Sequence, residues 1–214
     1  MKKLVFLHGA GSDKNAYNDL MLQIAKQFDA ELISFNAPFP HPSKPNKFIW
    51  FNKFEQNGRR DAVVNDYNQS LEYIKGKLLE LGLNLEDIIL VGHSQGGGMA
   101  VHIGLEMKLN RVISVSGDLP YNIEYEKKAD TPIYWFEGAK DTYIDQNRKD
   151  SYKMLQRIGA NLQYNILPNS THNDFANDII YSYHYTVCLN SFQSFTGCSE
   201  KPTLSNALKC CAPQ

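Results

Sequence analysis

The chain has 214 residues, enough for one domain with a sizeable core, and its 43% hydrophobic and 21% charged residues are ordinary for a globular protein. Its formal net charge of −1 provides no general attraction to nucleic acid or to an anionic membrane surface. No apolar run is long enough to span a membrane, so we expect neither a nucleic-acid partner nor stable membrane insertion.

Apolar and amphipathic segments alternate along the chain. Short apolar runs predict strands at 3–8, 30–35, 87–91, 111–116, 132–137 and 161–167. Segments with apolar residues three and four positions apart predict helices at 13–28, 61–81, 96–107, 145–158 and about 174–185. Such alternation is typical of a mostly parallel sheet with helices on both faces. We expect this α/β domain to occupy residues 1–190.

The first predicted strand runs into a glycine-rich stretch, Leu7-His8-Gly9-Ala10-Gly11. It lacks the third glycine of a dinucleotide-binding loop and the Gly-Lys-Ser/Thr of a P-loop, so a nucleotide site is not expected. Loops at the carboxyl ends of parallel strands commonly form the binding site of an α/β protein. We therefore expect this stretch to border the site.

The connection at 36–60 is long and rich in proline and aromatic residues. Loops of this length in a compact domain are usually functional or disordered, and the aromatic content argues against disorder. Phe39, Trp50 and Phe51 are candidates for the wall of an apolar substrate cleft. Trp50 and Phe51 could equally plug the edge of the core, because pockets and cores use the same side chains.

The most informative motif is Gly92-x-Ser94-x-Gly96, between the predicted strand 87–91 and the predicted helix 96–107. A sharp strand-to-helix turn with serine at its apex needs glycine on both sides, because the turn crowds the positions two before and two after the serine. Such a turn exposes the hydroxyl at the carboxyl edge of the sheet. We predict Ser94 as a nucleophile; the alternative is a glycine-rich turn with an incidental serine.

A serine hydroxyl is a weak nucleophile unless a histidine, oriented by a carboxylate, accepts its proton. In the hydrolase fold that has this turn, the chain order is serine, then Asp or Glu, then histidine. His172 follows the strand predicted at 161–167 and is the histidine that this order favours. The other histidines precede the serine, lie in turns or within a helix, or lie further along the chain: His8, His41, His93, His102 and His184.

The orienting carboxylate must lie between Ser94 and His172, just after a strand. Asp141 directly follows the strand predicted at 132–137 and is our first choice. Asp118 follows the preceding strand and is the second choice. Asp145 is placed to cap the next predicted helix.

Acyl transfer also requires donors for the negative charge that develops on the carbonyl oxygen. The backbone N–H of Gln95, which follows the nucleophile, is one candidate donor. The backbone N–H of Ala10 in the glycine-rich stretch is the other.

The stretches Leu7–Asp13 and Gly92–Ala100, with the loops that carry Asp141 and His172, resemble the phospholipase/carboxylesterase family, in the acyl-protein-thioesterase-like branch of the α/β hydrolases. The Ser-Gln-Gly-Gly sequence that begins at Ser94 is the most specific part, and the resemblance covers roughly residues 3–185. It implies an α/β-hydrolase fold with no separate lid domain, and hydrolysis of carboxylic esters or thioesters.

The resemblance also implies the site residues. The catalytic residues are Ser94, Asp141 and His172, and the oxyanion donors are Ala10 and Gln95. The Trp50-Phe51 pair is similar to part of the family's middle loop.

The chain departs from the family pattern at two places. Ser170-Thr171 precede His172, where the family usually has glycine, and residues 181–187 alternate like a strand where the family closes with an amphipathic helix. Residues 191–214 form a polar, Cys-containing tail, for which partial disorder and coverage of a surface groove both remain open.

The residues and the resemblance together predict a serine hydrolase that forms an acyl-serine intermediate and needs neither a metal nor an organic cofactor. The expected substrate is a small ester or thioester with a short to medium acyl chain. A peptidase or amidase on the same fold, or a non-catalytic binding protein, are the alternatives. The cysteines lack zinc-finger or CxxC spacing, so reduced thiols and a cytoplasmic location are expected; the oligomeric state stays open.

Overall fold

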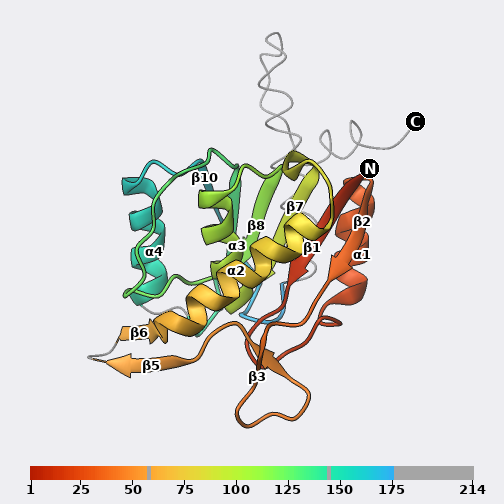
Figure 1. Cartoon of the computed structure of the whole chain (residues 1–214). Helices are drawn as coiled ribbons and strands as arrows, with labels where there is room; N and C mark the ends of the chain where they lie inside the picture. Colours follow the sequence, from red (N-terminus) through yellow and green to blue (C-terminus); the bar gives the residue numbers. More distant parts are fainter. Residues whose placement is uncertain (57–58, 144–145, 176–214) are drawn as a thin grey trace.

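In the computed structural model, which describes residues 1–56, 59–143 and 146–175, a six-stranded parallel sheet forms the centre of the molecule (Figure 1). The strand order is β10-β9-β8-β7-β1-β2. The strands are β1 (Lys2–Leu7), β2 (Ala30–Ser34), β7 (Ile88–His93), β8 (Arg111–Val115), β9 (Ile133–Gly138) and β10 (Leu162–Leu167). All the strands run parallel, so their carboxyl ends share one edge of the sheet.

Helices cover both faces of this sheet, as predicted. The helices α2 (Val64–Glu80), α3 (Gln95–Glu106) and α4 (Gln146–Arg157) lie on one face, where their apolar residues join a core that includes Val5 and Leu90. Helix α1 (Asn18–Gln27) packs its buried side chains on the other face, against Phe6 and Val91. The central strands are therefore buried on both faces, which explains why β7 is apolar throughout its first four residues.

The six predicted strands and the first four predicted helices are present, with some shifted bounds. Helix α1 begins at Asn18 and not at 13, because Asp13 accepts the Asn15 amide in a separate turn that precedes it. The helix predicted from 61 begins at Val64, since the residues before it form a strand. The helix predicted near 174–185 and the tail from 191 lie almost wholly outside the described residues.

The connection predicted as a long loop contains two antiparallel hairpins. Strand β3 (Phe39–Pro40) pairs with β4 (Phe48–Ile49), and β5 (Lys53–Gln56) pairs with β6 (Arg59–Ala62). Figure 1 shows the β3 hairpin projecting from the end of the molecule to which the carboxyl ends of the strands point. These strands are two or four residues long, and all four residues of β5 are exposed, so no alternation of apolar and polar side chains marks them in the sequence.

Neither a separate lid domain nor a helix long and apolar enough to cross a membrane occurs in the part of the chain that the structure describes.

Candidate active site

Ser94 lies in a strained turn between β7 and α3, at the carboxyl edge of the sheet. Its φ of 53° and ψ of −119° are unfavourable for a residue with a side chain. A Cβ added to Gly92 would lie 2.2 Å from the carbonyl oxygen of Gly96, and one added to Gly96 would lie 2.3 Å from that of Leu7. Both glycines are thus required by the close approach of backbone, and the turn leaves the Ser94 side chain partly exposed.

The structure brings Ser94, His172 and Asp141 together. His172 Nε2 lies 3.1 Å from Ser94 Oγ, and His172 Nδ1 lies 2.9 Å from Asp141 Oδ2. An ionised carboxylate can only accept, so the Asp141 contact places the proton of a neutral His172 on Nδ1. The lone pair of Nε2 then faces the Ser94 hydroxyl, which is the arrangement needed for His172 to accept its proton.

The loops that carry Asp141 and His172 pack directly on each other. Gly138, at the end of β9, allows this contact, because a Cβ there would lie 2.4 Å from the Ser170 carbonyl oxygen. The same carbonyl accepts the Lys140 amide at 2.9 Å. The Asp141 side chain is fully buried, and its Oδ1 accepts the Tyr143 amide at 2.8 Å. The carboxylate is therefore fixed before any ligand binds.

The residues that replace the family's usual glycine stabilise the histidine loop in another way. Ser170 is buried, and Thr171 closes a turn by accepting the Asp174 amide on Oγ1 and donating its own amide to the Asp174 carbonyl, both at 3.1 Å. These bonds hold His172 at the apex of a closed turn, so the departure does not displace the histidine.

His93 supports His172, a role that the sequence analysis did not assign. Its Nε2 lies 2.9 Å from the His172 carbonyl oxygen, and its ring packs against those of Tyr17, His172 and Phe175. The carbonyl is an acceptor, so His93 donates. In the sequence, the feature that could have indicated this role is the position of His93 directly before Ser94.

Two backbone amides near Ser94 have no hydrogen-bond acceptor among the described residues. The amide of Gly11 donates to the Phe48 carbonyl, whereas those of Ala10 and Gln95 donate to no group in the ranges 1–56, 59–143 and 146–175. These are the amides predicted as oxyanion donors. Their availability suits them to a developing negative charge.

The Gln95 side chain has a structural task that the sequence analysis missed. Its Oε1 accepts the Trp50 amide at 2.8 Å, and its Nε2 donates to the Phe51 carbonyl at 2.7 Å. Trp50 also donates from Nε1 to the His8 carbonyl at 2.7 Å. The nucleophile turn, the first strand end and the middle connection are thereby joined.

The expectation that Trp50 and Phe51 contact substrate is corrected by their burial. Their exposed fractions are 0% and 1%, and both side chains belong to the core, which is the alternative that the sequence left open. Aromatic rings of Phe35 and Tyr67 pack against them. Phe39 pairs with Ile49 in the β3 hairpin and is not among the residues that line the Ser94 pocket, so its contact with substrate stays a prediction.

A pocket of about 420 Å³ opens over Ser94, within the size range of small-ligand sites. It is lined by Gly9, Ala10, Gly11, Ser12, Tyr17, Lys44, Lys53, His93, Ser94, Asp118, Tyr143, His172 and Asn173. This lining is predominantly polar, in contrast to the apolar cleft expected from the aromatic sequence of the connection. Lys44 and Lys53 were not predicted, and nothing in their sequence positions indicated that they would face the serine.

The remaining candidates lie elsewhere or have other partners. The second-choice carboxylate, Asp118, lines the pocket but pairs with Lys53 at 2.9 Å. His41 accepts backbone amides within the β3–β4 turn, and His102 contacts Tyr67 inside the core, where burial lowers its pKa to about 4. Asp145, His184 and the cysteines lie outside the described residues.

No cluster of three or more His, Cys, Asp or Glu residues suited to a metal ion occurs among the described residues. The groups gathered around Ser94 include His172, the Asp141 carboxylate and two backbone amides that have no acceptor among the described residues.

Comparison with known proteins identifies the family and the fold of the chain. The family described as Phospholipase/Carboxylesterase matches residues 1–185. The acyl-protein thioesterase 1 homolog 2 of Dictyostelium discoideum is 27% identical in an alignment of length 188 that covers 79% of this chain and 84% of that protein.

Solved structures with the same fold include esterase PE8, with a TM-score of 0.70 and 23% identity over 87% of this chain and 91% of that one. The structure of SOBER1 from Arabidopsis thaliana has a TM-score of 0.67 and 20% identity over 85% of this chain and 95% of that one. At these identities the structural likeness establishes the fold, and the family match extends over all of the described residues.

Proposed function

Because this chain belongs to the phospholipase/carboxylesterase family, we propose that it hydrolyses carboxylic esters or thioesters through an acyl-serine intermediate on Ser94. The observation that carries this proposal is the position of His172, whose two ring nitrogens lie within hydrogen-bond distance of Ser94 Oγ and Asp141 Oδ2. A serine, a base and an orienting carboxylate in this order are the requirements for nucleophilic acyl transfer.

In the first step, His172 Nε2 takes the hydroxyl proton as Ser94 Oγ attacks the carbonyl carbon. The resulting imidazolium is stabilised by the buried Asp141 carboxylate. The oxyanion accepts from the amides of Ala10 and Gln95, which have no other acceptor among the described residues. Such preorganised donors typically contribute about 3–4 kcal/mol each to the stabilisation of the transition state.

In the second step, His172 gives its proton to the leaving alcohol or thiol, and the acyl group stays on Ser94. Water then attacks the acyl-enzyme with His172 again as base, and the carboxylic acid is released. Replacement of Ser94 should abolish both steps, because Ser94 Oγ makes the first attack and carries the acyl group in the second.

The test is active-site labelling with a fluorophosphonate, followed by peptide mapping, together with hydrolysis of a 4-nitrophenyl ester. The wild type should carry the label on Ser94, and Ser94→Ala should lose the label and at least about a thousandfold in kcat. Ser34→Ala, at the end of β2 and outside the pocket lining, is the matched control and should label normally.

A folded wild type that takes no label and cleaves no ester would favour the non-catalytic alternative. Faster cleavage of aminoacyl amides than of esters would favour the amidase alternative.

A further inference from the structure

The turn between β3 and β4 has a fixed conformation. His41 donates its amide to the Lys47 carbonyl at 2.7 Å, and Lys47 donates its own to the Lys44 carbonyl at 3.2 Å. His41 Nδ1 accepts the amides of Ser43 and Lys44, each at 3.1 Å. The backbone that carries Lys44 is therefore held by bonds within the turn.

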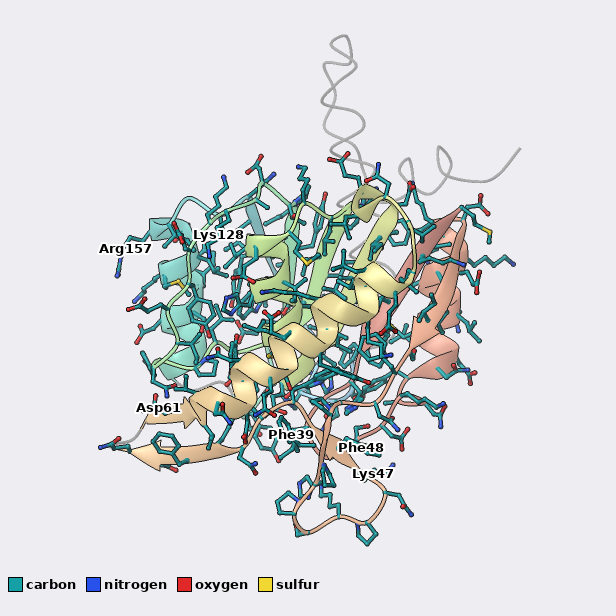
Figure 2. All side chains as sticks on the ribbon, viewed as in Figure 1. Phe39, Lys47, Phe48, Asp61, Lys128 and Arg157 are labelled. Carbon is teal, nitrogen blue, oxygen red and sulfur yellow. The ribbon has the colours of Figure 1, made fainter. Side chains whose placement is uncertain are left out.

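This turn is also fastened to the glycine-rich loop beside Ser94. The Gly11 amide donates to the Phe48 carbonyl, and the Phe48 amide donates to the Ser12 carbonyl, both at 2.9 Å. Lys47 Nζ pairs with Asp13 Oδ2 at 2.5 Å. Figure 2 shows Lys47 and Phe48 where the turn joins the body of the molecule. The two loops thus form one unit at the mouth of the pocket.

Lys44 extends from this turn over the glycine-rich loop. A Cβ added to Gly11 would lie 3.0 Å from Lys44 Nζ, so the ammonium group rests directly on Gly11. Gly11 follows Ala10, the proposed oxyanion donor, and Lys44 lines the pocket that contains Ser94. The cation is thereby placed next to the groups that would surround a bound ester.

The charges around Lys44 leave it available to a ligand. The other lysine of the pocket, Lys53, is neutralised by Asp118 at 2.9 Å, and the nearby Asp13 is paired with Lys47. Lys44 has no carboxylate partner within the described part of the chain. With two lysines and one aspartate, the charged residues of the lining carry a net charge of +1, in a protein whose formal net charge is −1.

We propose that Lys44 determines substrate specificity by binding an anionic group of the substrate, a carboxylate or a phosphate, a few bonds from the scissile carbonyl. This inference rests on the proposed ester hydrolysis at Ser94 and names its substrate class. An ammonium at a partly open pocket binds through a salt-sensitive ion pair, so the preference should appear in kcat/KM and weaken as ionic strength rises.

The test compares matched esters that differ in charge. On the acyl side, 4-nitrophenyl hydrogen glutarate is compared with its methyl ester; on the alcohol side, 4-acetoxybenzoate is compared with methyl 4-acetoxybenzoate. As a phosphate probe, 4-acetoxyphenyl phosphate is compared with the neutral methyl 4-acetoxybenzoate. The readout is the ratio of kcat/KM for the anionic ester to that for its neutral partner, which shows which side of the scissile bond carries the anion.

Lys44→Gln should lower this ratio roughly two- to fivefold for at least one pair, which is the range expected of a partly exposed ion pair. Lys44→Glu should lower it further, and Lys44→Arg should retain it. Lys26→Gln, an exposed lysine of α1 outside the pocket, removes the same charge and should leave the ratio at its wild-type value. Raising the salt from about 0.01 M to about 0.5 M should lower the ratio of the wild type more than that of Lys44→Gln.

An unchanged ratio in Lys44→Gln for every pair overturns the inference. If Ser94→Ala still abolishes hydrolysis in that case, the proposed function stands and only the role of Lys44 is lost. If the wild type cleaves none of these esters and takes no fluorophosphonate label, the proposed function fails, and the inference fails with it.

Discussion

Two segments that meet at the site, the nucleophile segment (88–106) and the middle segment (36–62), hold their conformations by different means. In the nucleophile segment the decisive contact is local, because Gly92 and Gly96 meet across the turn that presents Ser94. In the middle segment the backbone at Trp50 depends on distant partners: Gln95 accepts its amide, and Ser70 donates to its carbonyl. A local constraint leaves a motif in the sequence, whereas a long-range one leaves only ordinary residues at unrelated positions.

The largest effect should come from breaking the local constraint. Gly92→Ala would place a Cβ 2.2 Å from the Gly96 carbonyl oxygen, a distance that requires the backbone of the turn to move. We expect a loss of about 4 kcal/mol or more in the free energy of unfolding, which is a large part of the stability of a typical domain. Urea denaturation, or the yield of folded protein, measures this loss.

The matched control is Gly76→Ala in α2, where an added Cβ meets no atom within 4 Å. This change should raise the free energy of unfolding by about 0.5–1 kcal/mol, since alanine is the better helix former. A similar change in the free energy of unfolding in the two variants would show that the Gly92 position is not sterically constrained.

A smaller loss of stability should follow from removing the hydrogen bonds between the Gln95 side chain and the middle segment. Gln95→Ala leaves the turn and the backbone N–H intact but removes the acceptor of the Trp50 amide and the donor to the Phe51 carbonyl, both at buried residues. We expect a loss of about 2–4 kcal/mol in the free energy of unfolding, because both buried backbone groups lose their partner. Gln23→Ala, at an exposed position of α1, should change it by less than about 0.5 kcal/mol. Equal losses in the two variants would contradict the role given to the Gln95 side chain.

The smallest effect concerns pH and the residue that links the glycine-rich loop to the middle segment. His8 Nε2 accepts the Ala37 amide at 3.0 Å, and burial lowers the pKa of His8 below its usual value. Between this lowered pKa and about 6.5 the unfolded chain binds a proton that the native protein does not bind, so the stability contributed by neutral His8 is lost as pH falls. His8→Gln keeps a side-chain acceptor for the Ala37 amide, but a glutamine side chain does not titrate.

The free energy of unfolding, measured from about pH 5 to about pH 8, should therefore fall less steeply towards acid in His8→Gln than in the wild type. His102, whose lowered pKa acts in the same direction, contributes to both proteins and cancels in the difference. If the free energy of unfolding depends on pH in the same way in His8→Gln and in the wild type, His8 has the same pKa in the native and unfolded states.

The site could be predicted in part from sequence because its main residues follow strands in a fixed order. Ser94, Asp141 and His172 each come just after a strand of the parallel sheet, and the carboxyl ends of those strands meet at one edge. The aromatic composition of the connection could not place Trp50 and Phe51, because an aromatic side chain suits a pocket and a core equally well and only the packing decides between them.

The sequence by itself determined the alternation of strands and helices, the turn in which Gly92 meets Gly96, and the order of Ser94, Asp141 and His172, since these depend on periodicity, on a contact within a few residues and on chain order. The tertiary structure decided that the middle segment forms hairpins, that His93 supports the histidine loop and that Lys44 lies over Gly11. Each of these depends on partners that are distant in sequence, and a long, flexible lysine or a common histidine carries no local pattern that specifies its partner.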